Sequence, residues 1–160
     1  MKQSLKTWLS FGVTSWIITT LGLMVWLSFW TNMKIAVIGG ILTIAIADAC
    51  SDALGIHISQ ESDNKNKTKS IWEATIATFV AKFLVAITFI VPVIVFSSLL
   101  TATIVSVIRG LFLLWLLSRH NAKVQKEKPY KVIREHVGIA ILVIIITYFV
   151  GIFISNTFSE

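Results

Sequence analysis

The chain has 160 residues, of which 56% are hydrophobic and only 14% are charged, whereas a soluble domain carries roughly 25% charged residues. A soluble chain of this length cannot bury so much apolar surface in one core, so the composition excludes an ordinary soluble domain. The formal net charge of +6 does not indicate nucleic acid, because the basic residues lie between the apolar stretches, where they set topology and contact anionic lipid headgroups.

Five apolar stretches are long enough to cross a bilayer, since a spanning helix needs about 20 mostly apolar residues. In chain order they cover residues 8–30, 35–58, 71–96, 99–117 and 137–153. The first resembles a signal peptide, but its apolar run exceeds the roughly 7–15 residues of such a segment and no small-x-small cleavage site follows. We expect a tight turn at Ser97–Ser98, because one continuous helix there would be too long for a single crossing. The sequence therefore predicts an all-α polytopic membrane protein, with five transmembrane helices in a single domain over residues 1–160.

The segments that connect these helices differ strongly in charge. Basic residues gather in the N-terminal segment, in the loop after the second helix and in the loop after the fourth: Lys2, Lys6, Lys65, Lys67, Lys69, Arg119, Lys123, Lys126, Lys128, Lys131 and Arg134. The other side has only Lys34. The positive-inside rule then predicts a cytoplasmic N-terminus and an external C-terminus. We expect the cell membrane of a prokaryote, or otherwise a vacuole-like membrane, with anionic lipid against the basic loops.

Four ionisable residues lie inside the predicted spans: Asp48 and Asp52 in the second, Lys82 in the third and Arg109 in the fourth. Each costs about 2.5–3.5 kcal/mol at a helix centre on insertion scales, so such residues usually have a function. At 1.5 Å per residue, three of them fall near the bilayer midplane, and Asp52 lies about one turn closer to the cytoplasm.

Asp48 and Asp52 are four residues apart and share a helix face. Hydroxyls from Ser51 and, in the first helix, from Ser15 and Thr19 would add neutral oxygens, a ligand set that suits a hard cation or a proton relay. Two neighbouring carboxylates resist ionising together, which is the physical basis for exchanging a proton for a cation. We predict that these five residues are the metal ligands.

Three further polar residues lie at the expected cytoplasmic end of the second and third helices. His57, Glu61 and Glu73 could form an entrance for the cation. The plainer interpretation is that they are interfacial or solvated groups.

Two interpretations of the intramembrane charges compete. In a transporter, Lys82 and Arg109 would be charge partners that release an acid when a cation binds. In a non-transporting scaffold, the same four charges would only hold helices together. An enzyme is not expected, because the sequence has no nucleophile elbow, Walker loop or zinc-protease helix motif.

Two sequence segments carry a family likeness. Residues 51–59 read Ser-Asp-Ala-Leu-Gly-Ile-His-Ile-Ser, and residues 12–19 read Gly-Val-Thr-Ser-Trp-Ile-Ile-Thr. They resemble the vacuolar iron transporter family, which has Ser-Met-small-Leu-Gly-Glu-Tyr-Leu-Ser at the end of its second helix and Gly-x-Asn-Asp-Gly-Leu-Val-Thr in its first. Pro92 also falls where that family has its outer proline.

The resemblance implies a homodimer of five-helix subunits that exports iron(II) or manganese from the cytosol in exchange for protons. The metal would be the transported substrate, with no tightly bound cofactor. This chain would be a divergent short member, because the loop at residues 59–70 leaves no room for the family's cytoplasmic metal-binding insert. The family's acid in the first helix falls on Ser15 and its methionine on Asp52, which shifts the expected site toward hard ligands.

Overall fold

The computed structural model describes residues 3–62 and 68–158, with side chains from Thr14 onward. The five elements are the helices α1 (Gln3–Thr31), α2 (Lys34–Glu61), α3 (Thr68–Val95), α4 (Leu99–Gln125) and α5 (Pro129–Phe158). Each contains a segment long and apolar enough to cross a membrane, and the described residues include no strand. The predicted all-α, five-helix membrane architecture is confirmed.

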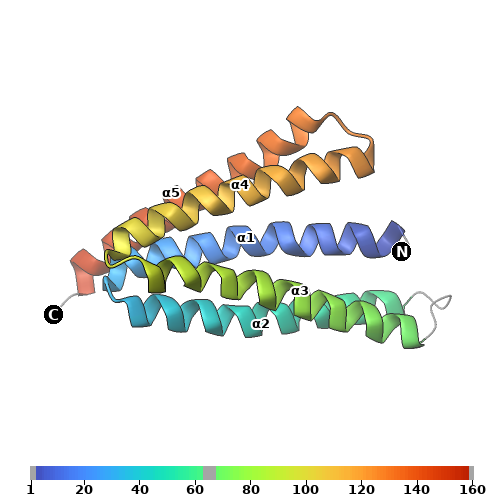
Figure 1. Cartoon of the computed structure of the whole chain (residues 1–160), viewed down its shortest axis with the longest axis horizontal. Coiled ribbons are helices and arrows are strands. Elements are labelled where there is room, and N and C mark those ends of the chain that lie inside the picture. Colours follow the sequence, from blue (N-terminus) through green and yellow to red (C-terminus); the bar gives the residue numbers. More distant parts are fainter. Residues whose placement is uncertain (1–2, 63–67, 159–160) are drawn as a thin grey trace.

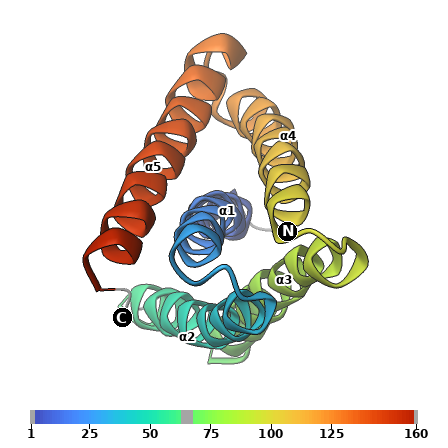
Figure 2. The same cartoon turned by 90° about the vertical axis from the view of Figure 1, so that its left-hand side faces the viewer.

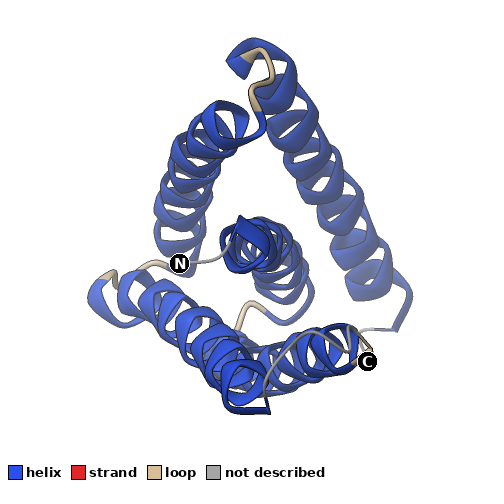
Figure 3. Ribbon diagram, turned by 90° about the vertical axis from the view of Figure 1, so that its right-hand side faces the viewer, coloured by secondary structure: helices blue, strands red, loops and turns tan. Residues whose placement is uncertain are grey.

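Helix α1 lies at the centre of the bundle, between the α2–α3 pair on one side and the α4–α5 pair on the other (Figures 2 and 3). Its side chains are accordingly buried on several faces, among them Trp16, Ile17, Leu21 and Met24. Glycine permits the close approach of α5, because a Cβ at Gly151 would lie 2.8 Å from the backbone carbonyl oxygen of Trp26. The core of this protein is therefore built around its first helix.

The helices extend further at the basic end than hydropathy predicted. Helix α4 continues to Gln125 instead of residue 117, and α5 begins at Pro129 instead of residue 137. Hydropathy marks only the part of a helix that lies in lipid, whereas backbone hydrogen bonding continues into the polar segment. Helix α4 stops where Lys126 adopts a left-handed conformation (φ 58°), and Pro129 suits the first turn of α5.

The turn predicted between the third and fourth helices is confirmed. Helix α3 ends at Val95, and Ser98 caps α4 by accepting a hydrogen bond from the Thr101 amide at 3.4 Å. Side-chain capping of this kind satisfies one of the unpaired amides at a helix start.

The connections fall at two ends of the bundle, as Figure 1 shows. The α1–α2 and α3–α4 connections lie at the end that holds the C-terminus, and the basic α4–α5 connection lies at the opposite end with the N-terminus. Lys2, Lys65 and Lys67 lie outside the described residues. This distribution agrees with the charge asymmetry read from the sequence, and the cytoplasmic placement of the N-terminus stays a prediction.

Candidate functional site

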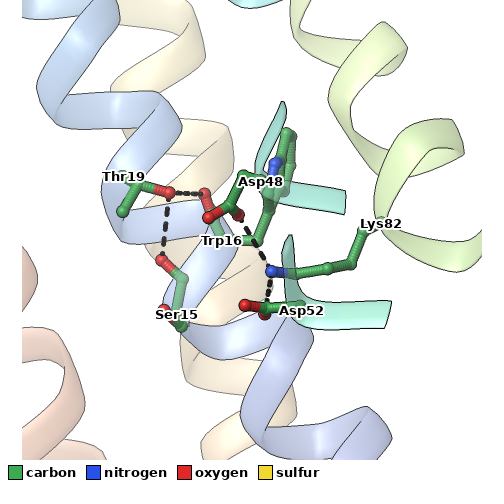
Figure 4. A network of polar contacts seen from close by, with 6 residues as sticks. All are labelled: Ser15, Trp16, Thr19, Asp48, Asp52 and Lys82. Atoms are coloured by element: carbon green, nitrogen blue, oxygen red, sulfur yellow. Dashed lines mark hydrogen bonds and ion pairs between the residues drawn. The ribbon is translucent and has the colours of Figure 1, made fainter. Parts of the chain in front are cut away.

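Lys82 is the centre of the polar cluster between α2 and α3. Its side chain is 1% exposed, and its Nζ atom lies 2.9 Å from Oδ2 of Asp48 while also bonding Oδ2 of Asp52 (Figure 4). On α3 it belongs to a buried row with Ala74, Thr78 and Ala86 at a spacing of four residues. These small neighbours allow the two helices to approach closely. The i, i+4 spacing of the acids then places both carboxylates on one ammonium.

A contact at the start of α2 aligns this helix with α3. Lys34 donates from its Nζ atom to the carbonyl oxygen of Phe96 at 2.6 Å, which aligns the start of α2 with the end of α3. Asp48 follows Lys34 by 14 residues and Lys82 precedes Phe96 by 14, so both lie roughly 21 Å from this contact. The depth match expected from the sequence thus has a structural cause.

The two carboxylates lie on the half-buried flank of α2 that turns toward α1. They belong to a row with Gly40 and Ile44 at a spacing of four residues. The residue that follows each member of this row is buried, so the row lies at the edge of the buried face of α2. At Gly40 the row meets α1, because a Cβ there would clash with the side chain of Leu27. Asp48 retains 26% and Asp52 32% of side-chain exposure. The acids are therefore open on one side, whereas the lysine between them is enclosed.

The predicted hydroxyl ligands of α1 are drawn beside this cluster in Figure 4. The Thr19 hydroxyl bonds to its own helix, donating to the carbonyl oxygens of Trp16 at 3.0 Å and Ser15 at 3.4 Å. The Ser15 residue is half-buried and Ser51 is exposed on α2. The indole Nε1 of Trp16 is buried and finds no hydrogen-bond partner among the described residues. The hydroxyl of Thr19 thus donates its hydrogen within α1, which leaves the lone pairs of its oxygen free.

Arg109 does not join the acids, contrary to the sequence-based expectation. Its Nη1 atom donates to the backbone carbonyl of Thr88 at 2.6 Å, and its guanidinium lies over the Phe89 ring, 5.6 Å from the centroid. Among the described residues it forms no ion pair. The physical reason is Pro92, four residues after Thr88, which lacks the N–H that would otherwise bond this carbonyl. That spacing was the signal in the sequence that could have identified the partner of Arg109.

The three residues of the predicted entrance lie away from the acids. His57 hydrogen-bonds through Nδ1 to the Thr75 hydroxyl at 3.0 Å and packs edge-on against Trp72. It lines a mostly apolar pocket of about 360 Å³ between α2 and α3, on the opposite flank of α2 from the acids. Glu61 and Glu73 are exposed at the basic end. The structure therefore does not bring this trio together with the carboxylates into one polar cluster.

No protein-family model matches this chain, and comparison with curated proteins and with solved structures found no significant match. The resemblance to vacuolar iron transporters therefore stays a prediction.

The carboxylate pair already holds a counter-ion from within the chain. Within the described part of the chain, no group of three or more His, Cys, Asp and Glu side chains is arranged to hold a metal ion. The cation that occupies the two carboxylates is the ammonium of Lys82. Any other cation that bound these two carboxylates would have to displace the lysine.

Proposed function

We propose that this chain is a proton-coupled membrane transporter of divalent metal cations, iron(II) or manganese, that exports them from the cytosol. The observation that supports the proposal best is the sharing of one enclosed lysine between two half-open carboxylates near the middle of two helices long enough to cross a membrane. Ionisable residues at that depth are expensive to insert and usually line a path for ions or protons.

The charges of the cluster account for the coupling to protons. With Asp48 and Asp52 ionised and Lys82 protonated, the cluster carries a formal charge of −1. A divalent ion that takes the place of the ammonium neutralises both carboxylates. The displaced lysine would then be a buried unpaired charge, which is unstable in an apolar surrounding. Removing this unpaired charge as the metal binds is the proposed link between metal movement and proton movement.

The same charges favour a divalent cargo over a monovalent one. Without the ammonium, the two carboxylates carry a formal charge of −2, and a monovalent ion in its place would leave half of that charge uncompensated. Carboxylate and hydroxyl oxygens suit hard divalent ions such as manganese. In this scheme Ser15, Thr19 and Ser51 provide neutral oxygens.

A second copy of the chain would complete the site. Two carboxylates fill only part of the coordination shell of a six-coordinate ion, and their open flank would face lipid in a lone subunit. We propose a homodimer in which this flank of α1 and α2 faces the partner. The basic α4–α5 hairpin would rest on anionic headgroups at the cytoplasmic surface.

The test is metal uptake into proteoliposomes with iron(II), manganese or zinc, with and without a proton gradient. We expect saturable uptake that needs the gradient and disappears in the variant with both Asp48→Asn and Asp52→Asn. Glu135→Gln is the matched control, because this acid is exposed on α5 and should transport normally. Absence of uptake by folded wild-type protein would contradict the proposal.

One observation favours a second candidate, a non-transporting membrane scaffold. Lys82 already neutralises an acid on α2, and no metal cluster of three such side chains occurs among the residues that the structure describes. In a scaffold, the charges serve only to join α2 to α3. Replacing all three by neutral residues of similar size should then leave the protein folded and as stable as before, because such an exchange of a buried ion pair is often neutral for stability.

A further inference from the structure

Helix α3 carries a proline in its membrane-spanning part, and the proline leaves one carbonyl without its helical partner. In an α-helix the carbonyl of each residue accepts from the N–H four residues later. For Thr88 that residue is Pro92, which has no N–H and whose ring pushes the carbonyl aside. The helix nevertheless continues, because the Phe96 amide donates to the carbonyl of Pro92 at 3.0 Å.

This carbonyl lies in a half-buried part of α3, in the segment that is long and apolar enough to cross a membrane. Its neighbours Phe89 and Pro92 are buried against the neighbouring helices. Inside a bilayer every backbone polar group has to find a partner within the protein. Neighbouring helices are one source of such partners, and here the partner comes from α4.

Arg109 makes two contacts with this part of α3. Its Nη1 atom donates to the Thr88 oxygen at 2.6 Å, and a hydrogen bond from an ionised donor is shorter and stronger than one between neutral groups. The guanidinium carbon lies over the Phe89 ring, 5.6 Å from its centroid, where the ring attracts the positive charge. A planar guanidinium can donate and stack at once, whereas a lysine ammonium supplies only the donor.

We propose that Arg109 is a positioning residue that replaces, from α4, the backbone hydrogen bond that Pro92 removes from α3. Its charge is thus held by a carbonyl and an aromatic ring and takes no part in the carboxylate cluster. The proposal stands whether or not the chain transports metal.

The contact also extends toward the charged cluster. The Phe89 ring beneath the guanidinium packs edge-on against Trp16 of α1, with 5.7 Å between the ring centroids. Trp16 is drawn beside Asp48 and Lys82 in Figure 4. Arg109 therefore fixes the outer part of the helix that carries Lys82, and does so through packing.

A double-mutant cycle between Arg109→Met and Pro92→Ala tests the proposal. In the natural background, Arg109→Met should raise the unfolding equilibrium constant in lipid by about tenfold or more, the usual effect of losing a hydrogen bond to a charged group. Pro92→Ala restores the missing N–H, so the same arginine change should then have a much smaller effect. Arg119→Met is the control, because Arg119 also lies over a ring, that of Trp115 at 5.7 Å, but should behave alike in both backgrounds.

The carbonyl itself gives a second readout. The ¹³C chemical shift of the Thr88 carbonyl, measured by NMR in lipid nanodiscs, should move upfield in Arg109→Met and return when Pro92→Ala is added. If Arg109→Met alone does not fold, the double variant should fold and supply both measurements. An equal effect of Arg109→Met in both backgrounds, an unchanged Thr88 shift, or a double variant that also fails to fold would overturn the proposal.

Discussion

Lys82 and Asp48 form an ion pair of unequal burial. Their Nζ and Oδ2 atoms are 2.9 Å apart, yet the lysine is 1% exposed and the aspartate 26% exposed. The ammonium is therefore stabilised by the two carboxylates and has almost no exposed surface. Each carboxylate is partly exposed and can also contact groups other than Lys82. We therefore expect loss of the lysine and loss of the carboxylates to have different effects on stability.

Loss of the lysine should destabilise the protein strongly. Lys82→Met leaves two carboxylates without a counter-charge at mid-membrane depth, and breaking a buried ion pair costs about 3–5 kcal/mol. Unfolding in mixed micelles or bicelles measures the change. Lys131→Met is the matched control, because Lys131 is exposed on α5, and its free energy of unfolding should hardly change. An equal effect of the two substitutions would show that the pair contributes nothing to stability.

Removing all three charges should separate folding from transport. Because no unpaired charge remains, the variant Asp48→Asn, Asp52→Asn and Lys82→Met should regain most of the stability that Lys82→Met loses. Uptake of manganese into proteoliposomes should stay absent. If both stability and uptake are normal, the proposed exchange site is wrong, and if neither recovers, the three residues have a role beyond their charges.

Gly151 should tolerate no side chain. A Cβ there would lie 2.8 Å from the Trp26 carbonyl oxygen, so Gly151→Ala would push α5 away from α1 and cost about 1–3 kcal/mol, the usual effect of overpacking. Gly138→Ala, on the same helix, is the control because a Cβ at Gly138 would have no neighbouring atom within 4 Å. We expect a lower melting temperature for the first substitution and an unchanged or slightly higher one for the second. Equal melting temperatures would contradict the close approach of the two helices.

Anionic lipid should stabilise the α4–α5 hairpin. Lys123, Lys126 and Lys131 are exposed at its tip, and each basic residue near an anionic surface contributes about 1 kcal/mol. Changing all three to Gln should reduce the rise in melting temperature caused by phosphatidylglycerol, while phosphatidylcholine should act equally on both proteins. High salt should weaken the effect in the natural protein. An undiminished response to phosphatidylglycerol would place the lipid contact elsewhere.

The helices could be predicted from the sequence because lipid imposes a simple length and hydropathy rule. The same reasoning placed Lys82 and Asp48 near the bilayer midplane. The structure brings them side by side, and the Lys34–Phe96 contact aligns the two helices that carry them. The ends of α4 and α5 were misjudged, because Leu117 and Val137 mark the limits of apolar sequence and the helices continue past both.

The partners of individual polar residues were harder to predict, because depth fixes only the position along a helix. Rotation about the helix axis decides which neighbour a side chain meets. His57 proved to bond Thr75 on the flank away from the acids. Arg109 was expected to meet a carboxylate and meets a backbone carbonyl. The prediction considered only charged partners and overlooked the carbonyl that Pro92 leaves without its helical hydrogen bond.

The central position of α1 has a consequence for biosynthesis. Helix α1 is made before the four helices that enclose it, and its contacts with α5 at Gly22 and Gly151 join segments that are far apart in sequence. These contacts can form only after α5 has left the ribosome. The side of α1 that faces α5 is therefore covered later in synthesis than the side that faces α2 and α3.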